Sequence, residues 1–502
     1  MAWRPELLRS SIRLVFIVIL ATSACAQTGT TFYVSTSGND NNSGTFGSPW
    51  RTIQHAAKSV AAGATVDVRG GSYNESVTIP VSGNASSGYV VFQNYPGESA
   101  IVDGTGVSCC GSSGVNGLFN IINQSYVIIS GFEIRNYSTT RAANTPAGIW
   151  ITGSGSNLQI LNNRVHNIVS KSERNGNAFG IAAYGTSATP ITNLTISGNQ
   201  VYSNKTGNSE TINVDGNVQQ FVISNNIVHD NDNIGIDAIG FEGVGPAGHD
   251  QAGYGSITGN TIYNISSYGN PAYGNQYAAD GIYCDGCANV TIERNLVHNS
   301  DLNIEVASEH KGHDSSYVIV RNNLVYHGNS NGISIGGYSS TVGGTDHCTI
   351  VGNTLFDNDT KNTGSGEFQV QYYATNNVFE NNIVDATSQG LLINNYTHSE
   401  PNPVTSDYNV YFTSNSANAQ WIWNGHTYTN FASYQQGSGQ DAHSFFADPE
   451  FLNMTTPDLH VKSTSPAVNQ GINLGATIVG TTDYAGNPRV QGPNIDIGAY
   501  EQ

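Results

Sequence analysis

The sequence predicts an all-β fold, a right-handed parallel β-helix solenoid with a short N-terminal capping helix and a C-terminal cap. Two repeated patterns and the composition favour this fold. A β-branched stretch followed by Asn recurs along the chain, and a second short apolar stretch follows the Asn by 10 to 23 residues. Only 11% of the residues are charged and 57 are glycine, so the chain offers little material for amphipathic helices.

The first 26 residues have the pattern of a secretory signal peptide. Arg4, Arg9 and Arg13 precede the apolar run 14–21, and the small residues at 24–26 suit a cleavage site. No later stretch reaches the roughly 18 consecutive apolar residues that a membrane-spanning helix needs. We therefore expect a secreted monomer, extracellular or periplasmic, with no membrane partner.

The ends of the mature chain lack the repeat and are predicted to cap the solenoid. Residues 27–105 should form the N-terminal cap and the first coils, residues 106–447 the β-helix, and residues 448–502 the C-terminal cap segment. The stretch 52–60 is the one convincing amphipathic helix, and we expect it to cover the open first coil, as solenoids require.

The repeated Asn is interpreted as a structural residue. Successive copies lie 27 to 36 residues apart, which fits one solenoid coil with its loops. An inward Asn at a fixed turn can bond to the backbone and to the Asn of the next coil, and Asn tolerates the left-handed conformation. The residues are Asn163, Asn199, Asn226, Asn260, Asn295, Asn323, Asn353 and Asn382.

The second strand pattern predicts a column of outward side chains. In each copy the mostly apolar residues on either side of a middle position should point into the core, because side chains alternate along a strand. The middle residue then faces solvent, and the stacked coils build a surface suited to a long ligand. The column is Trp150, Ala182, Asn213, Asp237, Tyr283, Glu305, Ser334 and Gln369.

The net charge of -19 makes nucleic acid an unsuitable partner. It also repels other polyanions, unless a bound cation or a local basic patch compensates. The acidic residues are concentrated where the column meets the longest insertions. Asp237, Asp285, Glu305 and Glu309 are therefore the candidate catalytic carboxyls.

Coil geometry brings these carboxyls to separations that glycosidases use. By register, Asp285 lies diagonally across from Glu305 and Asp237 lies two coils away, at about 8 and 9.6 Å between backbones. Hydrolysis of a glycosidic bond needs one protonated and one ionised carboxyl. We expect Asp285 to be the nucleophile or base and Glu309 or Glu305 the acid. Asp285 also stands at an Asp-Gly step, where Asp is common for backbone reasons alone, whereas Glu305 lies in mid-strand.

Tyr283 follows Asp237 by 46 positions, and about 20 of the residues in this span should form loops that wall a cleft. They carry Tyr254, Tyr268, Tyr273 and Tyr277, whose rings suit sugars. The side chains expected to bind substrate are Trp150, Asn213, Tyr283, His310, His313 and Tyr338.

The chain resembles bacterial secreted right-handed β-helix proteins of the pectate-lyase-like superfamily, of the carbohydrate-active type. The resemblance rests on the segments 32–40 and 48–53, the repeats, and the tail Asp496-Ile-Gly-Ala-Tyr-Glu501. It implies a polysaccharide or oligosaccharide as partner, and it marks the architecture rather than a reaction. A β-xylosidase-type group on this fold resembles this chain in placing an Asp and a Glu about one coil apart, as Asp285 and Glu309 are.

Two other functions remain open. A lyase reaction would use Lys311, between His310 and His313, as base, and calcium held by Asp215 and Asp237. Lyases on this fold commonly pair such a Lys with an Arg in a neighbouring coil, and the stretch 332–337 has no basic residue. A hydrolase needs no cofactor. A carbohydrate-binding β-helix without catalysis is the third class.

The cysteines predict one local disulfide. Cys284 and Cys287 have the spacing of half a zinc site, but in an exported chain a disulfide between them is the better interpretation. It would stiffen the turn that carries Asp285. Cys348 is then left over and is expected to be buried.

Overall fold

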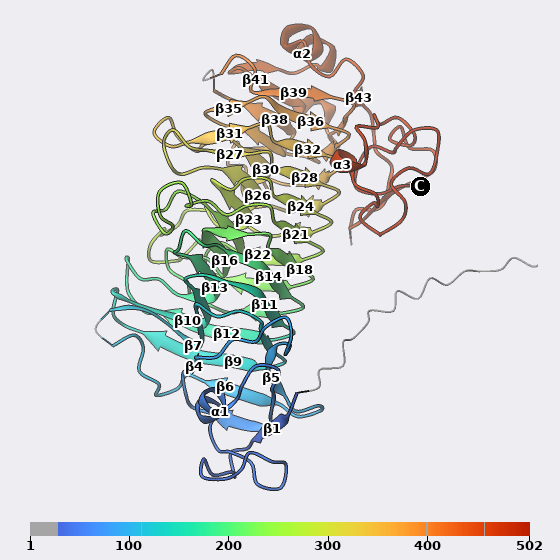
Figure 1. The fold of residues 1–502 in the computed structure, drawn as a ribbon. Coiled ribbons are helices and arrows are strands. Elements are labelled where there is room, and N and C mark those ends of the chain that lie inside the picture. Colours follow the sequence, from blue (N-terminus) through green and yellow to red (C-terminus); the bar gives the residue numbers. More distant parts are fainter. Residues whose placement is uncertain (1–28, 112, 398–399, 456) are drawn as a thin grey trace, which may run out of the picture.

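The structure is a computed structural model that describes residues 29–111, 113–397, 400–455 and 457–502. The expected signal peptide, residues 1–26, lies outside the described residues. The coils stack into one elongated body, with the N-terminal strands at one end and the helix of residues 431–438 at the other (Figure 1). Within the described part of the chain, no helix is long and apolar enough to cross a membrane.

The chain folds as the predicted right-handed parallel β-helix, with three long sheets. Each coil contributes a strand to each sheet, so that neighbours in a sheet come from successive coils. In spatial order the first sheet contains β1 (Thr31–Val34), β2 (Thr65–Val68), β5 (Val90–Asn94), β8 (Val127–Ser130), β11 (Gly155–Leu161), β14 (Ile191–Ser197), β18 (Val222–Ser224), β21 (Ser256–Thr258), β24 (Thr291–Glu293), β28 (Ile319–Arg321), β32 (Thr349–Val351), β36 (Asn377–Glu380) and β39 (Val404–Asp407), with β17 (Val218–Gln219) beside β14.

The second sheet carries the predicted outward column. Its strands are parallel except for the last pair, a hairpin. They are β4 (Val77–Ile79), β7 (Gly114–Ile122), β10 (Asn144–Thr152), β13 (Phe179–Gly185), β16 (Ile212–Gly216), β20 (Ile236–Ile239), β23 (Asp280–Asp285), β26 (Leu302–Ala307), β30 (Asn331–Ile335), β34 (Phe368–Val370), β38 (Leu391–Asn395), β41 (Gln420–Trp423) and β42 (His426–Tyr428).

The third sheet completes the coils, and two small sheets are attached to the body. The third sheet contains β3 (Gly71–Tyr73), β6 (Ala100–Asp103), β9 (Glu133–Thr139), β12 (Arg164–Ser170), β15 (Gln200–Tyr202), β19 (Ile227–Asn231), β22 (Thr261–Ile265), β25 (Leu296–His298), β29 (Leu324–Tyr326), β33 (Thr354–Phe356), β37 (Ile383–Asp385), β40 (Val410–Phe412) and β43 (Phe445–Phe446). The small sheets are β27 (Asp314–Ser316), β31 (Gly344–Asp346) and β35 (Ala374–Thr375), and the antiparallel pair β44 (Phe451–Asn453) and β45 (Asp458–Val461).

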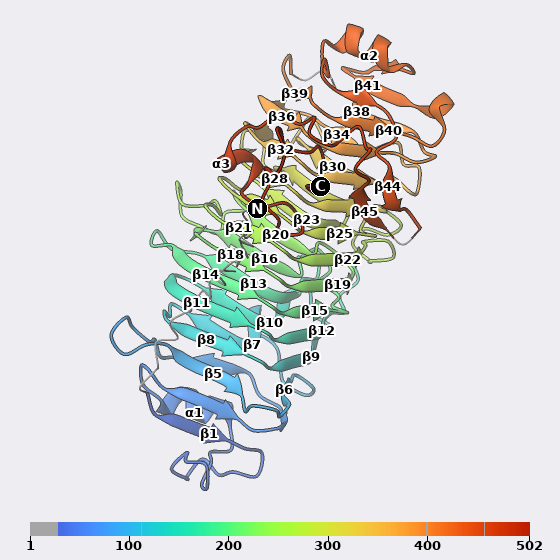
Figure 2. The ribbon, with the colours of Figure 1, turned by 90° about the vertical axis from the view of Figure 1, so that its right-hand side faces the viewer.

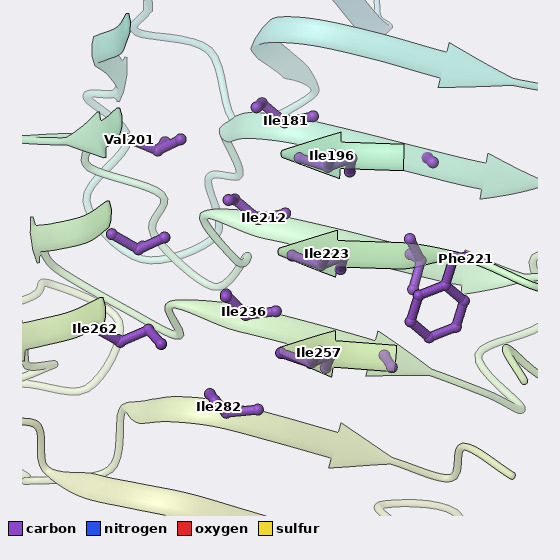
Figure 3. Close-up of a cluster of buried hydrophobic side chains, with 14 of the residues drawn as sticks. Ile181, Ile196, Val201, Ile212, Phe221, Ile223, Ile236, Ile257, Ile262 and Ile282 are labelled. Atoms are coloured by element: carbon purple, nitrogen blue, oxygen red, sulfur yellow. The ribbon is translucent and has the colours of Figure 1, made fainter. Parts of the chain in front are cut away.

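Stacked β-branched side chains fill the core (Figure 3). Ile212 and Ile236 are paired across successive coils of the second sheet, and Ile223 and Ile257 are paired in the first. All four are fully buried, and each contributes about 2 kcal/mol through the apolar surface that it removes from water. The repetition of one shape in each coil explains why so few residue types suffice.

The Asn ladder is confirmed in all eight predicted positions and extends one coil further, to Asn409. At each step the side-chain amide nitrogen donates to the amide oxygen of the next Asn, for example Asn226 to Asn260 at 3.0 Å. The same nitrogen donates to a strand carbonyl of the previous coil, Ile196 O at 2.9 Å for Asn226. The sequence predicts the left-handed conformation at the ladder Asn itself. It lies instead at the residue before it, such as Asn225 with φ 54°.

The N-terminal helix is confirmed as α1 (Ile53–Ser59), with the Thr52 side chain accepting a hydrogen bond from the backbone of His55. The C-terminal prediction needs a correction. The last coil is covered by α2 (Phe431–Ser438), after the short 3-10 helix η1 (Ser416–Asn418), and Trp421 packs against Tyr434 there. The tail with α3 (Ala476–Val479) lies along the side of the solenoid instead (Figure 2), where Asn322 donates to Val479 O.

The tail follows the side because its apolar residues have partners there. Phe451, Leu459 and Ile497 pack with Phe356 and Ile383 of the third sheet. This contact buries apolar surface of the tail and of the outer face of the third sheet, which would otherwise face water.

Alternating His and Tyr rings stack along the outer face of the third sheet, one ring per coil. The centroids are 4.8 to 5.2 Å apart and the ring planes are within 14° of parallel. This ring ladder contains His166, Tyr202, His229, Tyr263, His298 and Tyr326. Its faces are occupied by neighbouring rings, so it supports coil stacking.

Candidate active site

The register of the predicted column in the second sheet is confirmed, but the expected exposure is wrong: seven of its eight residues are buried, all except Gln369. Asn213 pairs with Asp237, Asp237 with Tyr283, and Tyr283 with Glu305. Asp285 pairs with Ala307, which places Asp285 diagonally across from Glu305 and Asp237 two coils from it. The register that the sequence predicted for these acids is therefore the register of the structure.

A cleft of about 360 Å³ opens over β16, β20 and β23. Six carboxyl groups line it, and none of its lining residues is Lys, Arg or His. Two insertions wall it, one carrying Glu242 and Val244 and the other Tyr273. Its acids are Glu210, Asp215, Asp237, Glu242, Asp285 and Glu309.

Asp285 and Glu309 form a pair on one side of this cleft. The backbone N–H of Glu309 donates to Oδ1 of Asp285 at 2.7 Å. Asp285 is buried and Glu309 is exposed, so the first lies at the floor and the second at the lip. The disulfide of Cys284 and Cys287, confirmed here, closes the turn that follows Asp285, and Cys348 is buried as expected.

The electrostatics of this pair favour shared protons. Burial, followed by the charge of Glu309, raises the pKa of Asp285 well above its usual range, and the Glu309 N–H opposes this rise. Although the residue as a whole is exposed, the cleft walls remove water from the Glu309 carboxyl, and this desolvation, followed by the charge of Glu242, raises its pKa. Like charges that raise one another's pKa allow one carboxyl to stay protonated while another is ionised.

Asp215 and Asp237 each hold an oxygen in the cleft that lacks a hydrogen-bond partner. In both residues this is Oδ1, and each residue is 2% exposed. Burial, followed by the charge of Glu242, raises the pKa of Asp215 to about 7. Burial, followed by the charge of Glu210, raises the pKa of Asp237 well above its usual range. An unpaired buried carboxylate is costly, so these oxygens call for a proton, a cation or a ligand.

Glu210 is a member of the cleft that the sequence analysis missed. It precedes β16, outside the strand positions from which the column was built, and only the turn places it beside the acids. Its Oε2 accepts from Asn213 Nδ2 at 2.8 Å. Burial and the charge of Asp215 raise its pKa to about 8. Asn213 itself is fully buried, so the expected substrate contact is corrected: this amide positions Glu210.

Glu305 lies beside the cleft and is held by hydrogen bonds. Its Oε1 accepts from Ser334 Oγ at 3.0 Å and from Gln371 Nε2 at 3.1 Å. It is 6% exposed, and burial raises its pKa to about 7 against the effect of the Ser334 hydrogen bond. Burial, followed by the charge of Glu305, raises the pKa of neighbouring Asp280 well above its usual range.

Glu242, Asp285 and His310 bring one potential metal ligand atom each within 4.8 Å of one another. His310 Nε2 lies 3.0 Å from Glu242 Oε1. The calcium ligands expected from the sequence were Asp215 and Asp237, which line the same cleft but are not in this group. Carboxylate oxygens are the ligands that calcium prefers, so the donor set of the cleft fits that ion.

Other expected site residues lie around the cleft or away from it. Tyr283 lines it, whereas Lys311 is exposed and is not among its lining residues. His313 stacks on Phe241, which follows the cleft strand β20, with centroids 4.2 Å apart. Tyr338 is 54% exposed, and the charge of Glu309 contributes to its raised pKa after burial.

Two aromatic residues are corrected. Trp150 is 8% exposed and packs against Phe179 and Tyr184, so it stabilises the outer face of the second sheet rather than offering a sugar platform. Tyr254 lies beside Ala288 in another depression, outside the cleft. Of the remaining loop tyrosines, Tyr273 lines the cleft, and Tyr268 and Tyr277 stack on each other at 4.9 Å.

Comparison with known proteins places the chain among right-handed β-helix proteins. Residues 32–188 match the family described as Pel9A-like, right handed beta helix region. The uncharacterized protein YwoF of Bacillus subtilis is 36% identical over 459 residues, which covers 91% of this chain and 96% of YwoF. Pectate lyase PEL9 of Emericella nidulans is 43% identical over 74 residues, 14% of this chain and 18% of that enzyme.

A solved structure with the same fold is the complex of XylC with xylose. It has a TM-score of 0.55 at 12% identity and covers 94% of this chain and 99% of the other. The match to the Pel9A-like family ends at residue 188, before the cleft acids begin at Glu210. These comparisons therefore establish the architecture, and the chemistry rests on the cleft.

Proposed function

We propose that this chain, which belongs to the same right-handed β-helix family as YwoF of Bacillus subtilis, is an exported enzyme that hydrolyses glycosidic bonds in a polysaccharide or oligosaccharide. The observation that carries the proposal is the pair Asp285 and Glu309 in a cleft lined by six carboxyls. Similarity to a pectate lyase over a short stretch and a shared fold with XylC support a carbohydrate substrate.

Asp285 acts as nucleophile or base in this mechanism. The Glu309 N–H donates to its Oδ1, which opposes the rise in the pKa of Asp285 and leaves Oδ2 for the anomeric carbon or for a water. Glu309 at the lip is the acid that protonates the leaving oxygen, a role that its raised pKa favours. Asp237 and Glu210, with raised pKa values, hold further protons in the cleft and hydrogen-bond sugar hydroxyls.

A second candidate function is calcium-assisted β-elimination on a uronic-acid polymer. The unpartnered Oδ1 atoms of Asp215 and Asp237 favour it, because a hard cation would satisfy both. When bound, calcium would neutralise the carboxylate of the substrate. Lys311, the expected base, does not line the cleft, which makes this the weaker of the two proposals.

The test is a panel of plant and microbial polysaccharides, with reducing ends and the absorbance of the unsaturated uronate product measured on the same samples. Hydrolysis produces reducing ends without that absorbance, and elimination produces both. Asp285→Asn and Glu309→Gln should each lower the rate of hydrolysis at least about 100-fold. Asp448→Asn, an exposed acid in the tail, is the matched control and should retain the rate.

The outcomes separate the classes. Unsaturated product at the same rate as new reducing ends contradicts hydrolysis. An absence of both signals on every substrate favours a binding protein. Full activity in Asp285→Asn removes Asp285 from the mechanism.

A further inference from the structure

A second concavity lies beside the acid cleft and has the opposite charge character. It has a volume of about 600 Å³, and Lys171, Arg174 and Lys205 line it together with Glu173 and Asp232. Three basic side chains against two acidic ones reverse the balance of the whole chain, which has 18 basic and 37 acidic residues. We call this site the basic pocket.

The basic pocket and the acid cleft share one wall. Gly176 and Gly207 line the pocket, and the residues that follow them, Asn177 and Asn208, line the cleft. The Asn208 N–H donates to Gly176 O at 3.1 Å, which joins the two segments. The basic pocket and the acid cleft are therefore adjacent, with this wall between them.

The lysines come from neighbouring coils. Val169 and Lys205 are paired in a parallel bridge at the end of the third sheet, which places the segment carrying Lys171 next to Lys205. The far side of the pocket is the loop of Tyr268 and Asn270, whose Nδ2 donates to Gly207 O at 2.8 Å. The pocket is thus built from two coils and a loop that the hydrogen bond holds to them.

The basic groups are available for a ligand. Within the described part of the chain, none of the three has an acidic partner within 4.0 Å, whereas arginines elsewhere do, such as Arg135 with Asp103. Of the two acids in the pocket, Asp232 is engaged, since its Oδ1 accepts from the Thr206 N–H at 2.7 Å. Glu173 is exposed to solvent.

We infer that the basic pocket is a subsite for an anionic group, a carboxylate or a sulfate, on a saccharide that occupies the acid cleft. This inference rests on the proposed function and adds the substrate class to it. The cleft itself repels anions, because its lining carries six acids and no base. A saccharide whose charged unit reaches Lys171 and Lys205 avoids that repulsion, while neutral units lie over Asp285 and Glu309. Lysine and arginine suit both anions as charge-assisted donors.

The test is a binding measurement by isothermal titration calorimetry in the Asp285→Asn background, which removes turnover. The probes are xylotriose that carries a single glucuronate, its methyl ester, xylotetraose, and xylotetraose that carries a single sulfate, so that each charged probe keeps neutral units for the acid cleft. The test variant is Lys171→Ala/Lys205→Ala. The matched control is Lys58→Ala/Lys462→Ala, which removes the same charge from two exposed lysines outside the pocket.

We expect at least one anionic probe to bind at least tenfold more tightly than the neutral probes. The pocket variant should lose about tenfold or more of that affinity, from loss of charge-assisted hydrogen bonds, while the control keeps it. The carboxylated and sulfated arms tell which anion is preferred. Equal affinity for anionic and neutral probes, no binding of any anionic probe, or an unchanged Kd in the pocket variant overturns the inference.

Binding and turnover fail separately. If wild-type protein binds an anionic probe through the lysines and cleaves nothing, the hydrolase proposal fails and the subsite stands. If wild-type protein cleaves only neutral saccharides, at a rate unaffected by Lys171→Ala/Lys205→Ala, the hydrolase proposal stands and the subsite fails.

Discussion

Replacing the buried carboxyl of Asp215 by an amide should stabilise the protein at high pH. The pKa of Asp215 is raised from 3.8 to about 7, with burial as the largest cause, and its Oδ1 has no hydrogen-bond partner. A group whose folded-state pKa is raised binds its proton more tightly in the folded chain. The stabilisation that Asp215 gives by binding this proton is therefore fully present below pH 3.8 and is lost as pH rises through 7.

The size of this effect follows from the shift. One pKa unit corresponds to about 1.4 kcal/mol, so the shift of Asp215 costs about 4 kcal/mol of folding free energy between pH 4 and pH 8.5. The residue is 2% exposed, so solvent screening removes little of this. Asp215→Asn keeps the shape and lacks the titration. From pH 4 to pH 8.5, the free energy of unfolding of the variant should rise by about 4 kcal/mol relative to that of the wild type. For a chain of this length that unfolds cooperatively, this corresponds to roughly 4 °C in Tm.

The assay is thermal unfolding of both proteins in EDTA at pH 4 and pH 8.5, repeated with 10-fold more calcium than chelator. Asp448→Asn, an exposed acid, is the control and should follow the wild type. If calcium binds the cleft, it should raise the wild-type Tm at pH 8.5 and reduce the advantage of Asp215→Asn. A difference between variant and wild type that is the same at both pH values would refute the burial argument.

Three further predictions test the site and the scaffold. If Glu309 is the acid, Glu305→Gln should lower kcat by less than about tenfold and Glu309→Gln should lower it by more than about 100-fold. The reverse ranking of the two variants would make Glu305 the acid. Asn260→Ala leaves Ile223 O and the donors of Asn226 unpaired and should cost about 3 kcal/mol in denaturant unfolding, against no change for exposed Asn41→Ala. Burial lowers the pKa of His298, so protonation of this side chain destabilises the folded protein as pH falls below 6.5. The Tm of His298→Phe, which has no imidazole to protonate, should therefore fall less than the wild-type Tm between pH 7 and pH 5.

The repeat determined most of the fold because a solenoid is built from local rules. Each coil contacts mainly its neighbours, so the spacing of Asn226 and Asn260 and the alternation around Asp237 fix the register without knowledge of distant parts. The same rules gave the positions of Asp285 and Glu305 on adjacent coils. They also gave α1, since its Thr cap and apolar face are contiguous in sequence.

The tertiary structure decided what the loops and the tail do. Glu210 joins the cleft and Trp150 leaves the substrate surface because turns and packing partners, rather than strand alternation, set their surroundings. The tail covers the side of the solenoid because its apolar residues match the third sheet. The meeting of Lys171 and Lys205 in one pocket likewise depends on how two coils and a loop fold together. Side chains alternate between the two faces of a strand, so the sequence predicts which face each one occupies. A loop has no such period, and its contacts are known only from the folded structure.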